Sequence, residues 1–315
     1  MPDWKRLSDN GYESTVVITI VHFNSLKDTL ACLQSVYSLV DGLHSVIVLD
    51  NGSDDANQIK EIKRLYPETA CYRSEYNMGS ARGSNEVVRL SESLCRWQYV
   101  LILDNDVVLD KECLNNMVKT MQLDEEVGIV GACILRSEPK NIVLTTGGKI
   151  VWWLGIKTDV GFNLDRTRVK HIGGERDWVD GCAMLIRKQL VDRIGLFNPR
   201  WVGFEDLAFC VRARLNGFKV VCNTDAVVWH KQSGSKRASH FEFTHKTGLA
   251  DIRRYMDAFR MMSPHPSISA VTAVVFGYPI QMLTYLLLTP DRNLRLYYHK
   301  RFIYSLLPNW VINRK

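Results

Sequence analysis

Short apolar runs alternate with amphipathic stretches along the first half of the chain, and most runs end in polar residues. Runs rich in Val, Ile and Leu predict buried β-strands at 16–21, 46–49, 99–103 and 128–135. The stretches between and beside them predict helices at 26–39, 59–65, 86–95 and 111–122. Ser25 is placed to cap the first of these helices.

This alternation of strands and helices predicts an α/β fold, with an open, mostly parallel sheet and helices on both of its faces. Ligands of such sheets bind beyond the carboxyl ends of the strands. Three strands end there in polar clusters: His22 with Asn24, residues 50–55, and residues 104–106. A loop of small residues, 77–85, precedes the third predicted helix.

The second half of the chain is less regular up to residue 177. The segment 178–186 predicts a strand that begins with polar groups, and Glu205 opens a predicted helix that ends near Leu215. Two more strands are expected at 219–222 and 226–229, and His230 follows the second.

The C-terminal part has a different character. Residues 246–262 place arginines among apolar positions, as an amphipathic helix does, and 268–289 contains no charged residue. The second segment is long enough to span a bilayer, although Gly277 and Pro279 argue against a spanning helix. Basic residues follow it, which favours an element lying on a membrane surface. A spanning helix and packing in the core or between copies of the chain remain alternatives.

Composition agrees with a folded protein of 315 residues, because 46% of them are hydrophobic and 23% are charged. The net charge of +6 is too small and too dispersed to indicate nucleic-acid binding, but it suits an anionic ligand or membrane surface. The eight cysteines form no CxxC pair and are expected to be reduced thiols. Residues 1–13 are polar, so we expect no secretory signal and a cytoplasmic location.

The pair Asp104 and Asp106 follows the third apolar strand directly. Two carboxylates at one strand end repel each other unless a cation lies beside them, and Mg²⁺ held this way commonly adds phosphate oxygens as ligands. His230 offers a neutral imidazole as a further metal ligand. The alternatives are a solvated acidic loop and an ordinary surface histidine.

Other strand ends and helix starts carry groups suited to a nucleotide and to proton transfer. Glu205 and Asp206 are carboxylates at a helix start, where one could accept a proton or both could simply be helix-terminal charges. Asp50 and Asp55 could bind a ribose or base, or serve only as turn formers. Arg82 could contact a diphosphate or base, or be a solvated loop charge.

Six segments in this order resemble family-2 glycosyltransferases of the glycosyltransferase-A fold, especially the rhamnosyltransferase-like branch. They are Val-Ile-Val-Leu-Asp-Asn-Gly-Ser-Asp-Asp (46–55), Asn-Met-Gly (77–79) with Arg82 and Asn85, Leu-Asp-Asn-Asp (103–106), Trp-Val-Asp-Gly-Cys-Ala-Met-Leu-Ile-Arg (178–187), Gly-Phe-Glu-Asp-Leu-Ala-Phe-Cys-Val-Arg-Ala-Arg (203–214) and His230. The resemblance covers about residues 15–240.

The resemblance implies inverting transfer by direct displacement, with Asp206 of the Glu205-Asp206 motif as catalytic base. It implies that Asp104, Asp106 and His230 hold a divalent metal, Mg²⁺ or Mn²⁺. The donor-binding set is His22, Asn24, Asp50, Asn77, Gly79, Arg82, Asn85, Asp104 and Asn105. The set for the transferred sugar and acceptor is Trp178, Asp180, Gly181 and Trp201.

These inferences divide the chain into a polar tail (1–14), a glycosyltransferase-A catalytic domain (15–245) and a helical C-terminal extension (246–315). The extension is expected to contact the inner face of the membrane or to form a homo-oligomer. The expected activity moves one sugar from dTDP-rhamnose or a UDP-hexose to a hydroxyl of a saccharide, expected to be lipid-linked, in cell-surface polysaccharide synthesis. Single transfer is expected because the family's processive Gln-x-x-Arg-Trp signature is absent.

Two other functions compete with this interpretation. A sugar nucleotidyltransferase would share the metal and the sheet, but it should carry a Gly-rich basic loop where His22-Phe23-Asn24 stands. A membrane-associated partner that kept the fold without catalysis is the other alternative.

Overall fold

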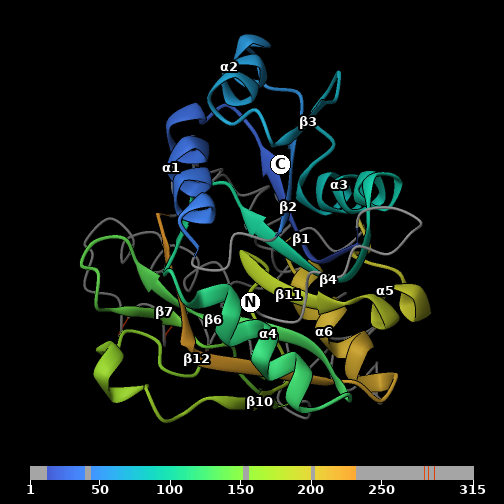
Figure 1. Ribbon diagram of the computed structural model, residues 1–315. Coiled ribbons are helices and arrows are strands. Elements are labelled where there is room, and N and C mark those ends of the chain that lie inside the picture. Colours follow the sequence, from blue (N-terminus) through green and yellow to red (C-terminus); the bar gives the residue numbers. More distant parts are fainter. Residues whose placement is uncertain are drawn as a thin grey trace, which may run out of the picture.

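The computed structural model describes residues 13–39, 44–151, 156–199 and 203–231, and the three helical residues Ile280, Leu283 and Leu287. Its strands (Figure 1) are β1 (Glu13–His22), β2 (Ser45–Asp50), β3 (Ala70–Arg73), β4 (Arg96–Asp104), β5 (Val107–Leu109), β6 (Val127–Arg136), β7 (Val143–Thr145), β8 (Ile150–Val151), β9 (Ile156–Lys157), β10 (Gly174–Arg176), β11 (Ala183–Arg187) and β12 (Lys219–His230). Its helices are α1 (Leu26–Tyr37), α2 (Asn57–Leu65), α3 (Ser80–Leu94), α4 (Cys113–Leu123), the 3₁₀ helix η1 (Arg166–Arg168), α5 (Lys188–Ile194) and α6 (Glu205–Leu215).

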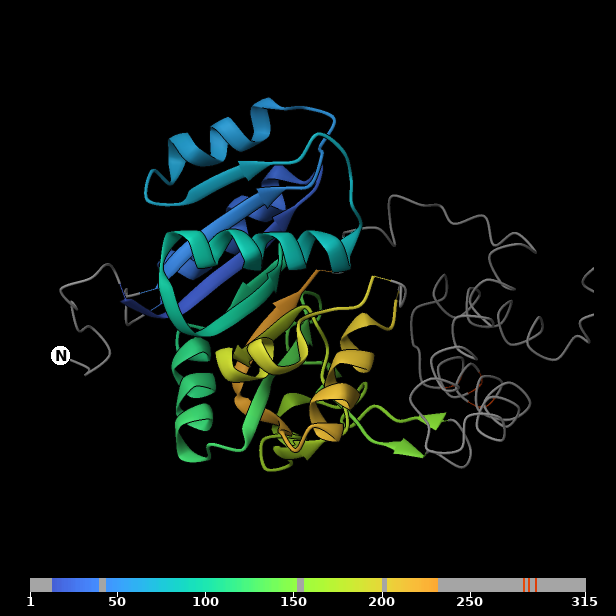
Figure 2. The same ribbon diagram turned by 90° about the vertical axis from the view of Figure 1, so that its right-hand side faces the viewer.

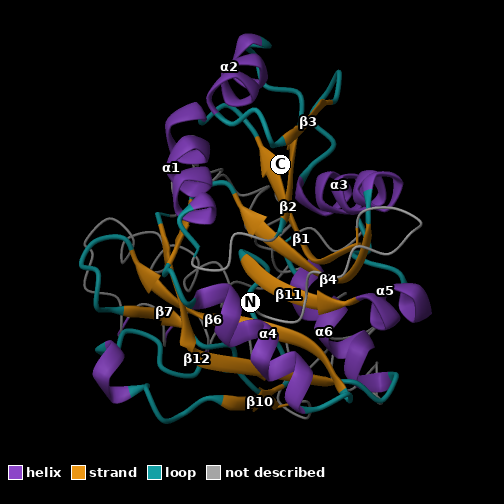
Figure 3. Ribbon diagram, in the orientation of Figure 1, coloured by secondary structure: helices purple, strands orange, loops and turns teal. Residues whose placement is uncertain are grey.

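One large mixed sheet forms the centre of the molecule (Figure 3). Its strands follow the order β10-β12-β6-β11-β4-β1-β2-β3, with β5 beside β12 and β7 beside β6. The four strands from β3 to β4 are parallel, as are β6 and β12. The strand β11 runs antiparallel between β4 and β6. The prediction of a mostly parallel sheet with flanking helices is therefore confirmed.

Strand register brings the polar strand ends together. The strand β1 pairs with β2 on one side and β4 on the other, with His22 opposite Asp50 and Val21 opposite Asp104. Because all three strands run in the same direction, their carboxyl ends lie at one edge of the sheet. The convergence of these segments, predicted from the order of strands and helices, is present in the structure.

The two faces of the sheet carry separate hydrophobic cores. Helices α1, α2 and α4 pack on one face, and α3, α5 and α6 cover the face turned toward the viewer in Figure 2. Neighbouring residues of β1 alternate between the cores, with Val17 in one and Ile18 and Ile20 in the other. Each such fully buried side chain stabilises the fold by about 1.5–3 kcal/mol.

Helix α3 begins at Ser80 and not at Glu86, so the predicted small-residue loop is mostly helix. Gly79 precedes it with a φ of +80°, a conformation that side chains other than glycine rarely adopt. A Cβ on Gly83 would stand 3.1 Å from a methyl group of Val21, so small residues let this helix approach β1 closely. Small residues in 77–85 had suggested a loop, but in the structure most of them belong to a helix that packs closely against the sheet.

Three other local predictions differ from the structure. The strand predicted over 178–186 is reduced to β11, because Trp178 forms only an isolated bridge with Gly148. The two strands predicted between 219 and 229 are one strand, β12, whose pairing with β6 shifts between Asn223 and Val227. The hydroxyl of Ser25 donates to Asp28 and makes no capping bond to α1.

The short β8–β9 hairpin is fixed at its base to the segment before β11. The Asp177 carboxylate accepts a hydrogen bond from the Ile150 amide at 2.7 Å. The indole of Trp178 donates to the Thr158 carbonyl at 3.2 Å. Gly148 precedes the hairpin and packs against the residue that follows its second strand, since a Cβ on this glycine would come within 1.6 Å of the Thr158 oxygen. Only glycine lets the two backbones approach this closely.

Most of the predicted C-terminal extension lies outside the described residues, which include only Ile280, Leu283 and Leu287 from 246–315. Within the portions that are described, no helix combines the length and apolar character that crossing a bilayer requires. At the other end, β1 begins at Glu13, inside the predicted polar tail.

Candidate active site

Asp104, Asp106 and His230 come together at the carboxyl edge of the sheet. Asp104 is the last residue of β4, and Asp106 directly precedes β5. Antiparallel pairing of β12 with β5 sets His230 opposite Val107, which brings the imidazole beside Asp106. One ligand atom from each of the three side chains lies within 4.8 Å of the others. This is the one group of three metal-ligating side chains within the described ranges.

The charges of this group suit a cation. Desolvation by the surrounding protein raises the pKa of Asp104 to about 6, although the residue keeps an exposed face; Asp106, Asp180 and Glu205 add to the rise and His230 opposes it. Burial lowers the pKa of His230, but its hydrogen bond to Asp106 and the nearby carboxylates outweigh burial and raise the pKa. The imidazole Nε2 lies 3.0 Å from Asp106 Oδ1. A metal ion bound by these side chains would compete with protons for the same ligand atoms.

Asp206 lies at the start of α6, opposite the turn that precedes β11. Its Oδ1 accepts from the Leu207 amide at 2.7 Å, and its Oδ2 accepts from the Gly181 amide at 3.1 Å. Burial raises the pKa of Asp206 to about 7; Asp180 and Glu205 add to the rise, whereas Lys157 and the Leu207 amide oppose it. The carboxylate is held in one orientation and can exchange a proton near neutral pH.

The turn before β11 shapes the surroundings of Asp206. A Cβ on Gly181 would stand 3.2 Å from Asp206 Cβ, so the turn passes close to α6. Asp180 Oδ1 accepts from the Cys182 amide at 2.9 Å, and Trp178 is 2% exposed. Glu205 accepts from the Gly203 amide. Trp201, assigned to the same pocket from sequence, lies outside the described residues.

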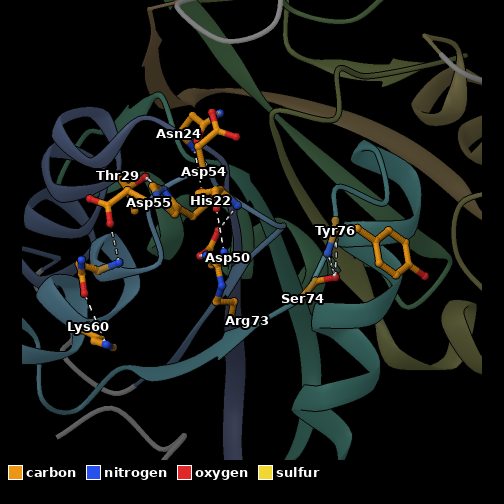
Figure 4. Close-up of polar contacts among 12 residues, drawn as sticks. His22, Asn24, Thr29, Asp50, Asp54, Asp55, Lys60, Arg73, Ser74 and Tyr76 are labelled. Atoms are coloured by element: carbon orange, nitrogen blue, oxygen red, sulfur yellow. Dashed lines mark hydrogen bonds and ion pairs between the residues drawn. The ribbon is translucent and has the colours of Figure 1, made fainter.

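Asp50 is fully buried at the end of β2 (Figure 4). Its Oδ1 accepts from the Ser53 amide at 2.9 Å, and its Oδ2 forms an ion pair with Arg73. The Arg73 guanidinium also donates to the Ser53 carbonyl at 2.8 Å. Asp50 therefore holds the 50–53 loop in shape, and Arg73 is the more exposed member of the pair.

Asparagines connect the loops that follow β1, β2 and β3. Asn24, with a φ of +55°, bonds through its side chain to Asp54, and its backbone amide donates to Ser53. Asn51 accepts from the Met78 amide at 3.0 Å and donates to Asn77 Oδ1 at 3.1 Å. The Asn77 oxygen also accepts from the Gly79 amide. These contacts bring Asn24, Asn77 and Gly79 to the same edge of the sheet as Asp50.

His22 and Asn105 meet at one hydroxyl beneath this edge. The Thr29 hydroxyl donates to the Ser25 carbonyl, accepts from Asn105 Nδ2 at 3.0 Å and lies 2.7 Å from His22 Nδ1. His22 is fully buried, so it supports the loop of Asp104 and Asp106 from below.

Arg82 and Asn85 belong to the first turns of α3 but point to different surroundings. Arg82 is exposed. The amide of Asn85 donates to the Phe197 carbonyl at 2.8 Å and accepts from the Phe197 amide at 3.1 Å. Both the oxygen and the nitrogen of the Asn85 side chain therefore bond to the segment after α5. The sequence had instead predicted that Asn85 contacts the nucleotide-sugar donor.

Three residues of this region were missed by the sequence analysis. Thr29 gave no signal, because a threonine within an amphipathic helix is unremarkable. Arg73 ends β3, a strand too short and polar to stand out. Lys157 lies in the two-residue strand β9, where its amine sits 3.7 Å above the centre of the Trp178 ring. The strand-end position of Arg73 is the only one of the three that the predicted topology could have indicated.

The sheet topology and the strand-end triad define a glycosyltransferase-A fold with a candidate metal site. The model of the family described as "Glycosyltransferase like family 2" matches residues 14–252, and the chain belongs to this family. The chain is similar over its full length to a solved mannosyltransferase, PcManGT from Pyrobaculum calidifontis, in complex with GDP-Man and Mn²⁺. The likeness has a TM-score of 0.55 at 16% identity and covers 99% of this chain and 92% of the other, and it bears on the fold alone.

Two curated relatives are similar in sequence. One is the low-salt glycan biosynthesis hexosyltransferase Agl10 of Haloferax volcanii, 24% identical over 208 residues, which is 64% of this chain and 62% of the relative. The other is the O-antigen biosynthesis protein RfbC of Myxococcus xanthus, 26% identical over 149 residues, which is 45% of this chain and 11% of the relative. The matched regions thus span under two thirds of either relative's length.

Proposed function

We propose that this chain is a metal-dependent inverting glycosyltransferase that moves one sugar from a nucleotide diphosphate sugar to a hydroxyl group of a saccharide. The observation that carries the proposal is the gathering of Asp104, Asp106 and His230 within 4.8 Å at the edge where Asp50 also lies. Family membership and the names of the relatives, a hexosyltransferase of glycan biosynthesis and an O-antigen biosynthesis protein, support the same class.

The donor set of the triad suits a hard divalent cation, Mg²⁺ or Mn²⁺, because two carboxylates and an imidazole supply oxygen and nitrogen ligands. Such an ion would neutralise the negative charge that develops on the leaving diphosphate. The solved mannosyltransferase of the same fold contains Mn²⁺. Thr29 and His22 hold Asn105, and through it the backbone between the two aspartates, in place.

Asp206 is the proposed catalytic base. Direct displacement requires a group that takes the proton from the acceptor hydroxyl as that hydroxyl attacks the sugar. The Leu207 and Gly181 amides fix both oxygens of the carboxylate, and the raised pKa of about 7 makes it a stronger base than an ordinary aspartate. Asp180 and Glu205 act on Asp206 from nearby, and we assign them to the surroundings of the transferred sugar and the acceptor, with the buried Trp178 supporting the turn.

Donor identity can be tested without knowing the acceptor. The purified chain is screened by thermal unfolding against dTDP-rhamnose, UDP-hexoses and GDP-mannose, with Mg²⁺ or Mn²⁺ and with EDTA as control. A donor present at 100 times its Kd should stabilise the fold by about 2.7 kcal/mol, and only when metal is present. Failure of every nucleotide sugar to stabilise the protein or to be hydrolysed would overturn the proposal.

We also propose that residues 246–315 attach the enzyme peripherally to the inner, cytoplasmic face of a membrane, where a lipid-linked saccharide is the acceptor. The support is the apolar stretch 268–289 followed by basic residues. Deleting 264–315 is expected to move the protein from the membrane fraction to the supernatant. Unchanged fractionation would instead favour packing within the chain or between copies of it.

A further inference from the structure

Lys157 is a positively charged residue beside an otherwise acidic group. Three carboxylates lie near one another there: Asp206 and Glu205 at the start of α6, and Asp180 in the turn before β11. Asp180, Lys157 and Glu205 are the charged groups with the largest effects on the pKa of Asp206, and Lys157 is the positive one of these three. Lys157 lies on β9, a strand that carries none of the family motifs noted in the sequence.

The position of Lys157 is built by the fold. Its amine rests 3.7 Å from the centre of the Trp178 ring, a cation–π contact with a nearly fully buried indole. Trp178 in turn donates from its indole to the carbonyl of Thr158, the residue that follows Lys157. Lysine and indole are therefore joined through both side chain and backbone.

The same segment connects Trp178 to the base. Three residues beyond Trp178, the Gly181 amide donates to Asp206 Oδ2 at 3.1 Å. At the other end, the Asp177 carboxylate holds the hairpin through the Ile150 amide and pairs with Arg214 of α6 at 2.8 Å. The hairpin, the turn and α6 thus fix one another, and the stacking on Trp178 holds the amine of Lys157 against the turn that contacts Asp206.

We propose that Lys157 is a positioning residue that keeps the carboxylate of Asp206 in the anionic form able to accept a proton. The inference rests on the proposed role of Asp206 as base. Burial and the two neighbouring carboxylates all favour the protonated form of Asp206, and a nearby ammonium group favours the ionised form. Lys157 supplies such a positive charge, because its amine stacks on Trp178 of the turn that also contacts Asp206.

The test is a carboxyl titration that needs no substrate. Protein labelled with ¹³C at the aspartate carboxyl carbons is titrated by NMR with Mg²⁺ present, and the Asp206 signal is assigned by its loss in Asp206→Asn. In Lys157→Met, which keeps an apolar stem on Trp178, the Asp206 midpoint is expected to rise by about one pH unit. The sign follows because removing a positive charge makes the carboxylate harder to ionise. Lys157→Arg is expected to restore the wild-type midpoint.

Lys149→Met is the matched control, since Lys149 lies at the base of the same hairpin but pairs with Asp177 at 3.6 Å. An Asp206 midpoint that is unchanged in Lys157→Met, or that moves equally in Lys149→Met, overturns the inference. If thermal unfolding shows that Lys157→Met does not fold, Lys157→Gln takes its place. Full turnover in Asp206→Asn would reject the proposed base and leave the titration result standing, so the two failures can be told apart.

Discussion

Replacing Asp206 with Asn is expected to lower turnover by about 10²- to 10⁴-fold, with donor affinity nearly unchanged. The amide keeps the size of the carboxylate but cannot take a proton from the acceptor hydroxyl. Asp206 lies with Asp180 and Gly181, whereas the metal triad is built from other strand ends, so donor binding should be retained. Initial rates with a donor found in the screen, and calorimetry of donor binding, measure the two quantities separately.

Asp206→Asn is also expected to destabilise the fold, so its free energy of unfolding must be measured together with its turnover. Two backbone amides, of Leu207 and Gly181, donate to the two carboxylate oxygens, and an amide side chain offers only one acceptor. We expect a loss of about 1 kcal/mol in the free energy of unfolding. Asp165→Asn is a matched control, because Asp165 also accepts from a backbone amide at a helix start and is only partly buried. Unchanged turnover in Asp206→Asn would sink the assignment of the base.

Replacing Asp106 with Ala is expected to weaken metal-dependent donor binding by about 100-fold or more, since loss of even an outer partner of a metal ligand costs 10- to 100-fold. The change removes one ligand and also the hydrogen-bond partner of His230. The pKa of His230 should then fall, because the bond to Asp106 is the largest contribution that raises it. Only Asp104 and His230 of the three candidate metal ligands would remain.

Calorimetry with Mn²⁺ or Mg²⁺ and the nucleotide-sugar donor measures this loss, and EDTA defines the metal-independent part. Asp110→Ala is the control, because Asp110 lies a few residues along the same loop and strand but outside the triad. Normal donor affinity in Asp106→Ala, with metal still required, would place the ion on other residues.

The fold followed largely from the sequence because its main signals are local. Buried parallel strands such as β1, β2 and β4 are continuous apolar runs, and α1 shows its helical period directly. The errors came where tertiary contacts outweighed local composition. Small residues that read as a loop form α3, since they allow it to lie against β1, and β10 exists only through its pairing with β12.

Site residues that directly follow or end a strand were predictable from the sequence, whereas residues placed by contacts between distant segments were not. Asp50 and Asp104 end parallel strands, so their position at one edge of the sheet follows from topology. Asn85 sits within a motif that resembles the family, yet its amide is committed to Phe197, a contact between segments far apart in the chain. No pattern in the sequence indicates which side chain a distant backbone will engage.

The sequence by itself determined the class of sheet, the edge at which ligands are expected to bind and the carboxylates gathered there, because hydrophobic period and strand order act along the chain. Only the tertiary structure decided which groups those carboxylates face. The pairing of β12 with β5 brings His230 to Asp106, and β3 brings Arg73 to Asp50. Stacking on Trp178 holds Lys157 against the turn that contacts Asp206. The charge environment of each carboxylate, and hence its chemistry, depends on neighbours that strand pairing and packing supply.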